Sequence, residues 1–136
     1  MAVAALVCAP VALAVFNKST LGGPLTVSTS TLAGAGEVNA TQSSCRVNKG
    51  VEIGVTWSAT NSSYATSYTV ERATASNGPY TSVASVEISK RSYTDSSGSL
   101  AYSTTYYYRV SAVYRSWGTA STVDSVKTLS KNCLSS

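Results

Sequence analysis

The chain of 136 residues contains no histidine, and only 12% of its residues are charged. Without histidine the protein lacks the commonest general base, the Ser-His-Asp and Cys-His catalytic arrangements, and the commonest zinc ligand. Its six acidic residues show no close pair along the sequence. We therefore predict that the protein is not an enzyme and that it uses no cofactor or metal ion.

Positive charge is also thinly spread. Ten Lys and Arg residues against six Asp and Glu residues give a net charge of +4, but only Lys90 and Arg91 are adjacent. A nucleic-acid-binding protein would need a clustered basic face or a recognisable motif, and the sequence shows neither. We therefore expect no nucleic-acid partner and interpret these charges as a solvated surface.

The first 16 residues are almost entirely apolar. This run is too short to cross a bilayer comfortably, and it ends in Ala12-Leu13-Ala14, a small-residue pattern that signal peptidase cleaves. We predict an export signal over residues 1–14, so that the chain meets the membrane only before processing and is then secreted or held at the cell surface. The absence of Lys or Arg before the run departs from the usual signal, and an uncleaved anchor helix is the alternative.

Residues 15–36 are rich in Ser, Thr and Gly and are expected to form a linker, with a short strand at 25–27 and a flexible hinge at 32–36. Cleavage would remove Cys8 and leave Cys45 and Cys133, which in an exported chain most simply pair. The bond would close a loop of 133 − 45 = 88 residue steps. Its chain-entropy gain would be about 4–5 kcal/mol. Two free thiols are the alternative.

From residue 37 onward the chain alternates between apolar and polar residues and turns at short intervals, which indicates an all-β fold. Two segments alternate most clearly: Val51, Ile53, Val55 and Trp57 share one face of the first, and Tyr106, Tyr108, Val110 and Ala112 share one face of the second. Seven strands are expected, at 38–44, 51–58, 67–74, 80–86, 92–94, 105–114 and 121–129. Residues 95–98 and 115–119 are expected to be loops, and Val123 is expected to point inward.

These segments resemble a fibronectin type III domain. The resemblance rests on the following residues, in the family's order: Val55-Thr56-Trp57, Tyr68-Thr69-Val70-Glu71-Arg72, Gly78-Pro79-Tyr80, Ser92-Tyr93-Thr94-Asp95, Leu100, and Tyr106 to Val113. It implies a seven-stranded fibronectin type III or immunoglobulin-like sandwich at 37–129, followed by a tail at 130–136. Ala14-Val15-Phe16, followed by the Thr/Ser-rich run from Leu25 to Leu32, also resembles exported bacterial proteins that include biofilm fibre subunits.

The resemblance also implies roles for single residues. Trp57 would fill the core between the sheets, and Leu100 followed by Tyr106 is similar to the family's tyrosine corner, in which the tyrosine hydroxyl bonds to the backbone just upstream. Tyr102 stands where the family usually has proline. The loop at 115–118 carries no Arg-Gly-Asp, so integrin-type adhesion is not implied.

Four residues are candidates for binding a partner. Trp117 stands beside Gly118 in a predicted hairpin loop, where a large aromatic side chain can anchor a ligand, and Arg115 could add polar recognition. Tyr107 and Tyr114 could extend this surface into a platform for a sugar or a peptide. Alternatively, Trp117 folds back over the end of the sandwich, and the tyrosines serve only packing.

The sequence therefore favours a non-enzymatic exported protein whose sandwich is a spacer or a weak module for binding protein or cell-wall glycan. One alternative is a structural subunit of a surface fibre or pilus-like assembly, and another is an accessory domain of a carbohydrate-active enzyme. Neither the ligand nor the oligomeric state follows from the sequence, because a fold does not determine a function.

Overall fold

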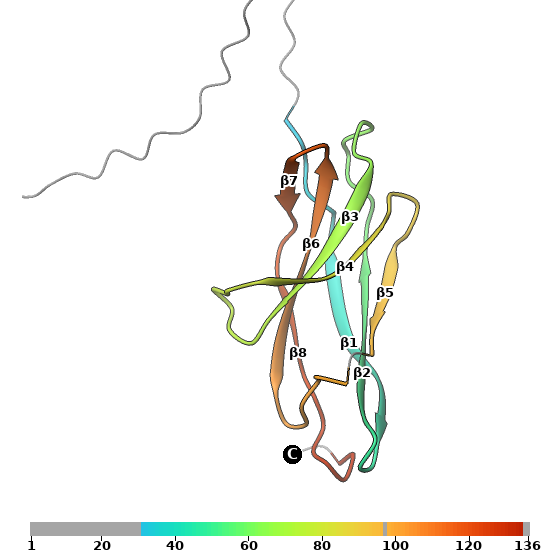
Figure 1. Cartoon of the computed structure of the whole chain (residues 1–136), viewed down its shortest axis with the longest axis vertical. Coiled ribbons are helices and arrows are strands. Elements are labelled where there is room, and N and C mark those ends of the chain that lie inside the picture. Colours follow the sequence, from blue (N-terminus) through green and yellow to red (C-terminus); the bar gives the residue numbers. More distant parts are fainter. Residues whose placement is uncertain (1–30, 97, 135–136) are drawn as a thin grey trace, which may run out of the picture.

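The computed structural model describes residues 31–96 and 98–134, which form eight antiparallel β-strands in two sheets (Figure 1). One sheet has the order β1-β2-β5, and the other has the order β4-β3-β6-β7, with β8 also paired to β6. The strands are β1 (Val38–Arg46), β2 (Gly50–Trp57), β3 (Ser67–Ala73), β4 (Thr81–Glu87), β5 (Ser92–Asp95), β6 (Thr105–Tyr114), β7 (Trp117–Ala120) and β8 (Asp124–Lys127). The predicted all-β sandwich is confirmed. The hydrophobic run, Cys8 and the strand expected at 25–27 lie outside the described residues.

The core lies between the sheets, where the predicted inner faces of β2 and β6 meet. Ile53, Val55, Tyr108 and Val110 are completely buried. Trp57 is only 5% exposed and packs edge-on against Tyr68, with 5.7 Å between ring centroids. Alternation predicts these faces well because successive side chains of a strand point to opposite sides of the sheet.

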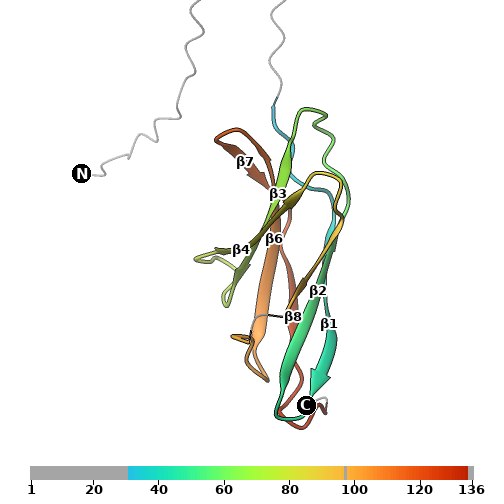
Figure 2. The same ribbon diagram turned by 45° about the vertical axis from the view of Figure 1, so that its right-hand side comes forward.

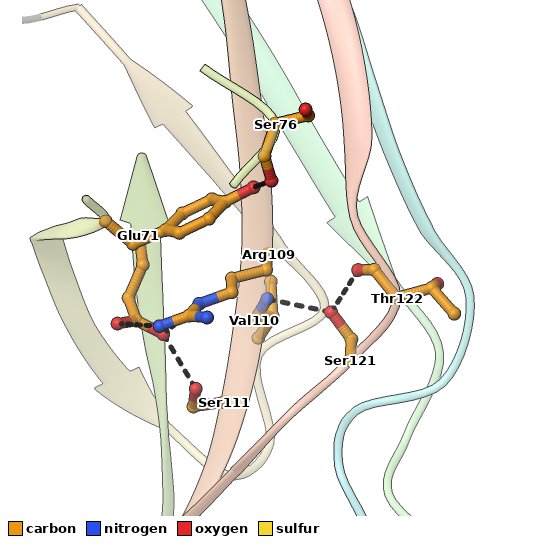
Figure 3. Close-up of polar contacts among 8 residues, drawn as sticks. Glu71, Ser76, Arg109, Val110, Ser111, Ser121 and Thr122 are labelled. Carbon is orange, nitrogen blue, oxygen red and sulfur yellow. Dashed lines mark hydrogen bonds and ion pairs between the residues drawn. The ribbon is translucent and has the colours of Figure 1, made fainter. Parts of the chain in front are cut away.

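The structure has eight strands where seven were predicted, because β7 lies mostly in the expected loop at 115–119. The strand expected at 121–129 is shorter and is formed only by β8. β7 pairs with the end of β6 and β8 with its beginning. Between them the Ser121 amide donates to the Val110 carbonyl, and the Ser121 hydroxyl accepts from the Val110 amide at 2.9 Å (Figure 3). Val123, which was expected to point inward, is 44% exposed because it lies between β7 and β8, whereas Val126 packs against the core.

The hinge expected at 32–36 is wrong, because this segment is fastened to the sandwich. Ala35 is buried, and the Ala33 amide donates to the Ser62 hydroxyl at 2.8 Å. A side chain on Gly34 would come within 2.5 Å of the Ala120 carbonyl oxygen, so glycine here permits a close approach to the end of β7. The small residues that suggested flexibility are therefore ones that let this segment pack closely.

The two sheets are joined along one side where β1 meets β8 and the tail. The Ala40 amide donates to the Asp124 carboxylate at 2.7 Å, and the Leu129 amide donates to the Gln42 side chain at 2.8 Å. Cys45 and Cys133 form the predicted disulfide bond, with their Cα atoms 5.7 Å apart. This row of links holds the C-terminal tail against the edge of the sandwich.

A tyrosine corner forms where β6 begins. Leu100 is buried, and the Tyr106 hydroxyl accepts a hydrogen bond of 2.8 Å from the Ala101 amide. Tyr102, in the place of the usual proline, donates its hydroxyl to the Arg46 carbonyl at 2.7 Å and accepts from the Gly50 amide at 2.6 Å. Tyr102 therefore ties the corner to the β1–β2 turn.

Candidate functional site

Trp117 lies at the start of β7, directly after a two-residue turn. It pairs with Tyr114, so that only Arg115 and Ser116 connect β6 to β7, and the loop expected at 115–119 is shorter than predicted. Arg115 has a φ of 54°, and positive φ is common at the first central position of such hairpin turns. The indole is 58% exposed, so Trp117 does not fold back to become part of the core.

Tyr114 and Arg115 lie beside Trp117 and stiffen this end of the sandwich. The Tyr114 ring meets the Tyr64 ring edge-on, with centroids 5.3 Å apart. The Arg115 guanidinium lies over the Tyr114 ring at 5.2 Å from its centroid. Stacking of this kind lowers the freedom of both side chains before any ligand arrives, which favours their use in recognition.

An open groove of about 240 Å³ runs from the turn along the outer face of the larger sheet. Glu71 and Ser111 lie on its floor, and Trp117 lies among the residues at its end. Glu71 accepts two hydrogen bonds from Arg109, at 3.0 and 3.1 Å, and a third of 2.8 Å from the Ser111 hydroxyl (Figure 3). Arg109 also stacks over the Tyr80 ring at 4.2 Å. The groove therefore presents fixed polar groups next to an exposed indole.

The Glu71–Arg109 pair remains charged over the whole physiological range. Burial alone would raise the pKa of Glu71, but the hydrogen bonds from Arg109 and Ser111 and the charge of Arg109 lower it below its ordinary value. The hydrogen bond to Glu71, helped by its charge, raises the pKa of Arg109 against the opposing effect of burial. Neither group is therefore suited to exchange a proton near neutral pH.

Tyr107 does not join the other three candidates. It faces outward from β6, opposite Ala73 of β3 and Ser125 of β8, and is partly exposed. It precedes Tyr114 by seven residues, which is about 23 Å along an extended strand. The structure thus brings Trp117, Arg115 and Tyr114 together at one end and leaves Tyr107 near the opposite end of β6.

A buried polar group escaped the sequence analysis. Asp95, which was placed in a loop, is the last residue of β5 and is completely buried. Its carboxylate accepts from Arg72 at 2.7 Å and from the Tyr108 hydroxyl at 2.8 Å. Burial, together with the hydrogen bond to Asp95 and its charge, raises the pKa of Tyr108. The sequence contained one signal of this buried group. Arg72 shares the inner face of its strand with Tyr68 and Val70, and a guanidinium on that face requires a buried acidic partner.

The part of the chain that the structure describes contains no group of three or more His, Cys, Asp or Glu residues placed to hold a metal ion. Within residues 31–96 and 98–134, no helix has the length and apolar character needed to span a membrane.

Comparison with known proteins identifies the family. No family model matches the sequence, and a search of curated proteins finds no match either. Among solved structures, a Fn3-like protein from Clostridium thermocellum is 34% identical, with a TM-score of 0.59 over 73% of this chain and 95% of that protein.

Two larger enzymes contain a region of the same fold. A pectate lyase from Erwinia chrysanthemi matches with 22% identity and a TM-score of 0.52, over 69% of this chain and 27% of the enzyme. A β-1,2-glucanase from Parabacteroides distasonis matches with 22% identity and a TM-score of 0.56, over 75% of this chain and 13% of the enzyme. With its tyrosine corner, its buried Trp57 and its likeness to the clostridial protein, this chain belongs to the fibronectin type III family.

Proposed function

We propose that this protein is a non-catalytic module that works outside the cytoplasm and binds a cell-wall glycan or a protein weakly through the β6–β7 end of its sandwich. The observation that carries the proposal is the exposed Trp117 indole on a two-residue hairpin turn. Tryptophan is among the residues that contribute most to binding when a partner covers them. A rigid turn keeps the entropic cost of ordering the site low.

The polar groups of the groove suit a ligand that combines hydroxyl groups with flat apolar surfaces. Glu71, which Arg109 holds in place, and Ser111 offer fixed hydrogen-bonding groups in the groove, and Trp117 offers a flat apolar face. A sugar ring has these two properties, as does a short polar peptide. The groove is open and small, so we expect weak binding that gains strength when several copies act together.

The disulfide bond supports a location outside the cytoplasm. Disulfide bonds persist in oxidising compartments and are rare in the reducing cytosol. The Cys45–Cys133 bond joins the first strand of the domain to its tail, where it can restrict the unfolded chain over a long loop. Secretion or display at the cell surface is therefore the localisation that we propose.

The direction in which the chain enters and leaves suits a spacer. Residues 31–36 enter beside β7, and the tail leaves beside the β1–β2 turn, at the opposite end of the sandwich (Figures 1 and 2). A domain whose ends lie far apart extends the distance between whatever is joined to them. The proposed spacer role is thus to separate what is joined at the β7 end, where Trp117 lies, from what is joined at the β1–β2 end.

An accessory role beside a carbohydrate-active enzyme is the second candidate. The matching regions make up 27% of the pectate lyase and 13% of the β-1,2-glucanase, so the same fold forms a minor part of these enzymes. The alternative of a fibre subunit remains a prediction from the sequence, because most of the segments on which it depends lie outside the described residues.

Replacing Trp117 with Ala tests the proposed function. We expect binding to isolated cell-wall fractions to weaken by about thirtyfold or more, since a hot-spot side chain contributes at least about 2 kcal/mol. Sedimentation with insoluble wall material and titration calorimetry with soluble fragments would measure the change. Val123→Ala is the matched control, because Val123 is also exposed but lies away from the turn.

The variant must also keep its thermal unfolding midpoint, which we expect because exposed residues contribute little to stability. Unchanged binding of a folded Trp117→Ala protein to every wall fraction and neighbouring protein that the parent binds would refute the proposal. Binding lost equally in both variants would refute it as well.

A further inference from the structure

A second concave site lies at the end of the sandwich opposite Trp117. It is a pocket of about 530 Å³ between the β1–β2 turn, the segment before β6 and the C-terminal tail. The ribbon shows the β1–β2 turn and the C-terminal tail at the same end of the molecule (Figure 1). Arg46 and Lys49 come from the turn, Lys131 comes from the tail, and Leu100 and Tyr102 line the side toward the core. Three chain segments that are distant in sequence thus bring three cations to one pocket.

The charges of this pocket are not balanced. Arg46, Lys49 and Lys131 are exposed, and none of them forms an ion pair with another described residue. Glu52 is the pocket's one carboxylate, and it accepts a hydrogen bond of 2.9 Å from Ser44. The lining charge is therefore 3 − 1 = +2. By contrast, Arg72 and Arg109 are both neutralised by carboxylates.

The structure holds in place the backbone that bears these cations. The Tyr102 hydroxyl bridges the two ends of the β1–β2 turn, between the Arg46 carbonyl and the Gly50 amide, and so fixes the loop that bears Lys49. Lys131 lies two residues before Cys133, and the disulfide bond to Cys45 ties that part of the tail to β1. The Cys133 amide also donates to the Ser130 carbonyl at 2.8 Å. The disulfide bond is thus what keeps the third cation at the pocket.

We propose that this pocket binds the negatively charged groups of an acidic polysaccharide, either uronate carboxylates or phosphates. A concave site with a net positive charge and an apolar wall fits one charged sugar unit better than it fits a flat surface. Recognition of an anionic membrane typically uses four to eight clustered Lys and Arg residues, and three is fewer. This site is separate from the Trp117 groove, so either proposal can fail while the other holds.

The first experiment measures binding to an oligogalacturonate, to a poly(glycerol phosphate) oligomer and to an uncharged hexose oligomer of equal length. We expect the two acidic probes to bind at low ionic strength and the uncharged one to bind far more weakly. Their relative affinities distinguish a carboxylate ligand from a phosphate ligand. Affinity should fall as salt is added, because exposed charges are screened.

Single substitutions then locate the site. Lys49→Gln and Lys131→Gln should each weaken binding of the acidic probe about three- to tenfold, in line with the loss of one close charge contact in a partly screened site. Lys90→Gln removes the same charge elsewhere and should leave the affinity within twofold. Reducing the disulfide bond in a protein that stays folded by circular dichroism should act like Lys131→Gln, because Lys131 is released.

Three outcomes would overturn this inference. One is equal affinity of the Lys49, Lys131 and Lys90 variants for the acidic probes. A second is equal binding of charged and uncharged oligomers. A third is a stronger and Lys49-dependent binding of anionic lipid vesicles or duplex DNA, which would assign the pocket to a different class of partner.

Discussion

Asp95 is the single residue that most changes the account derived from the sequence. The stretch Asp95 to Gly98, which consists of Asp, two Ser and Gly, is typical of a loop. In the structure, however, Asp95 still belongs to β5, where it pairs with Ile53 and is buried in the core. There its carboxylate meets Arg72 and the Tyr108 hydroxyl. Local composition could not predict this burial, because the partners that stabilise the charge come from β3 and β6.

Replacing Asp95 with Ala should destabilise the fold by about 3–5 kcal/mol, because it leaves the Arg72 charge partly buried without its carboxylate. Tyr108→Phe removes one hydrogen bond from the same group and should cost about 1–2 kcal/mol. Urea unfolding followed by circular dichroism would measure both. If the free energy of unfolding of Asp95→Ala lies within about 0.5 kcal/mol of the parent value, the ion pair contributes nothing to stability. A change this small is usual only for substitutions on the surface.

At the scale of elements, β2 and β6 were predictable because each alternates without interruption over eight or more residues. β1 was harder, since it contains a bulge between Gln42 and Ser44. Before the bulge, even-numbered residues such as Ala40 face the core; after it, Cys45 lies opposite the inward-facing Val51. The bulge leaves one extra residue, Ser43, unpaired and so keeps Cys45 on the side on which Cys133 lies.

Deleting Ser43 tests this account of β1. Without the extra residue the strand should alternate regularly, with Gln42 still opposite Ile53 and Cys45 still opposite Val51, so the disulfide bond should still form. Thiol titration of the unfolded protein should then find Cys45 and Cys133 oxidised, and the variant should keep the roughly 4 kcal/mol that the cross-link contributes. Free thiols at both Cys45 and Cys133 in the folded deletion variant would contradict the proposed role of the bulge. Thr41→Ala, on the same strand but without a shift in register, is the control.

The bounds of β7 and β8 were the other feature that the sequence pattern could not predict. The Val110 amide donates to the Ser121 hydroxyl instead of to a backbone carbonyl of the neighbouring strand. The strand pairing is interrupted there, and this break separates β7 from β8. The apolar residues Val123 and Val126 are an odd number of positions apart, which required an irregularity without showing where it lies. It lies at residues 121–123, so Val123 is exposed while Val126 packs against the core.

For the whole molecule, the sandwich and its two ends have different roles. The core and the β1–β8 side form one cross-linked body, which the alternation of the sequence and the pair Cys45 and Cys133 predicted. The ends carry the proposed sites: Trp117 at one and three cations at the other. Trp117 could be proposed from the sequence because its residue type and the hairpin turn beside it are both local features of the sequence. The cationic pocket was not, since scattered Lys and Arg residues are brought together only by folding.

The two tryptophans of the chain allow the central claim to be tested directly, because Trp57 should be in the core and Trp117 in water. The measurement is acrylamide quenching of fluorescence in the parent protein and in Trp117→Phe. We predict that the parent has one readily quenched component, and that Trp117→Phe leaves only the blue-shifted, protected emission of Trp57. Red-shifted and freely quenched emission from folded Trp117→Phe would place Trp57 in water and contradict the sandwich.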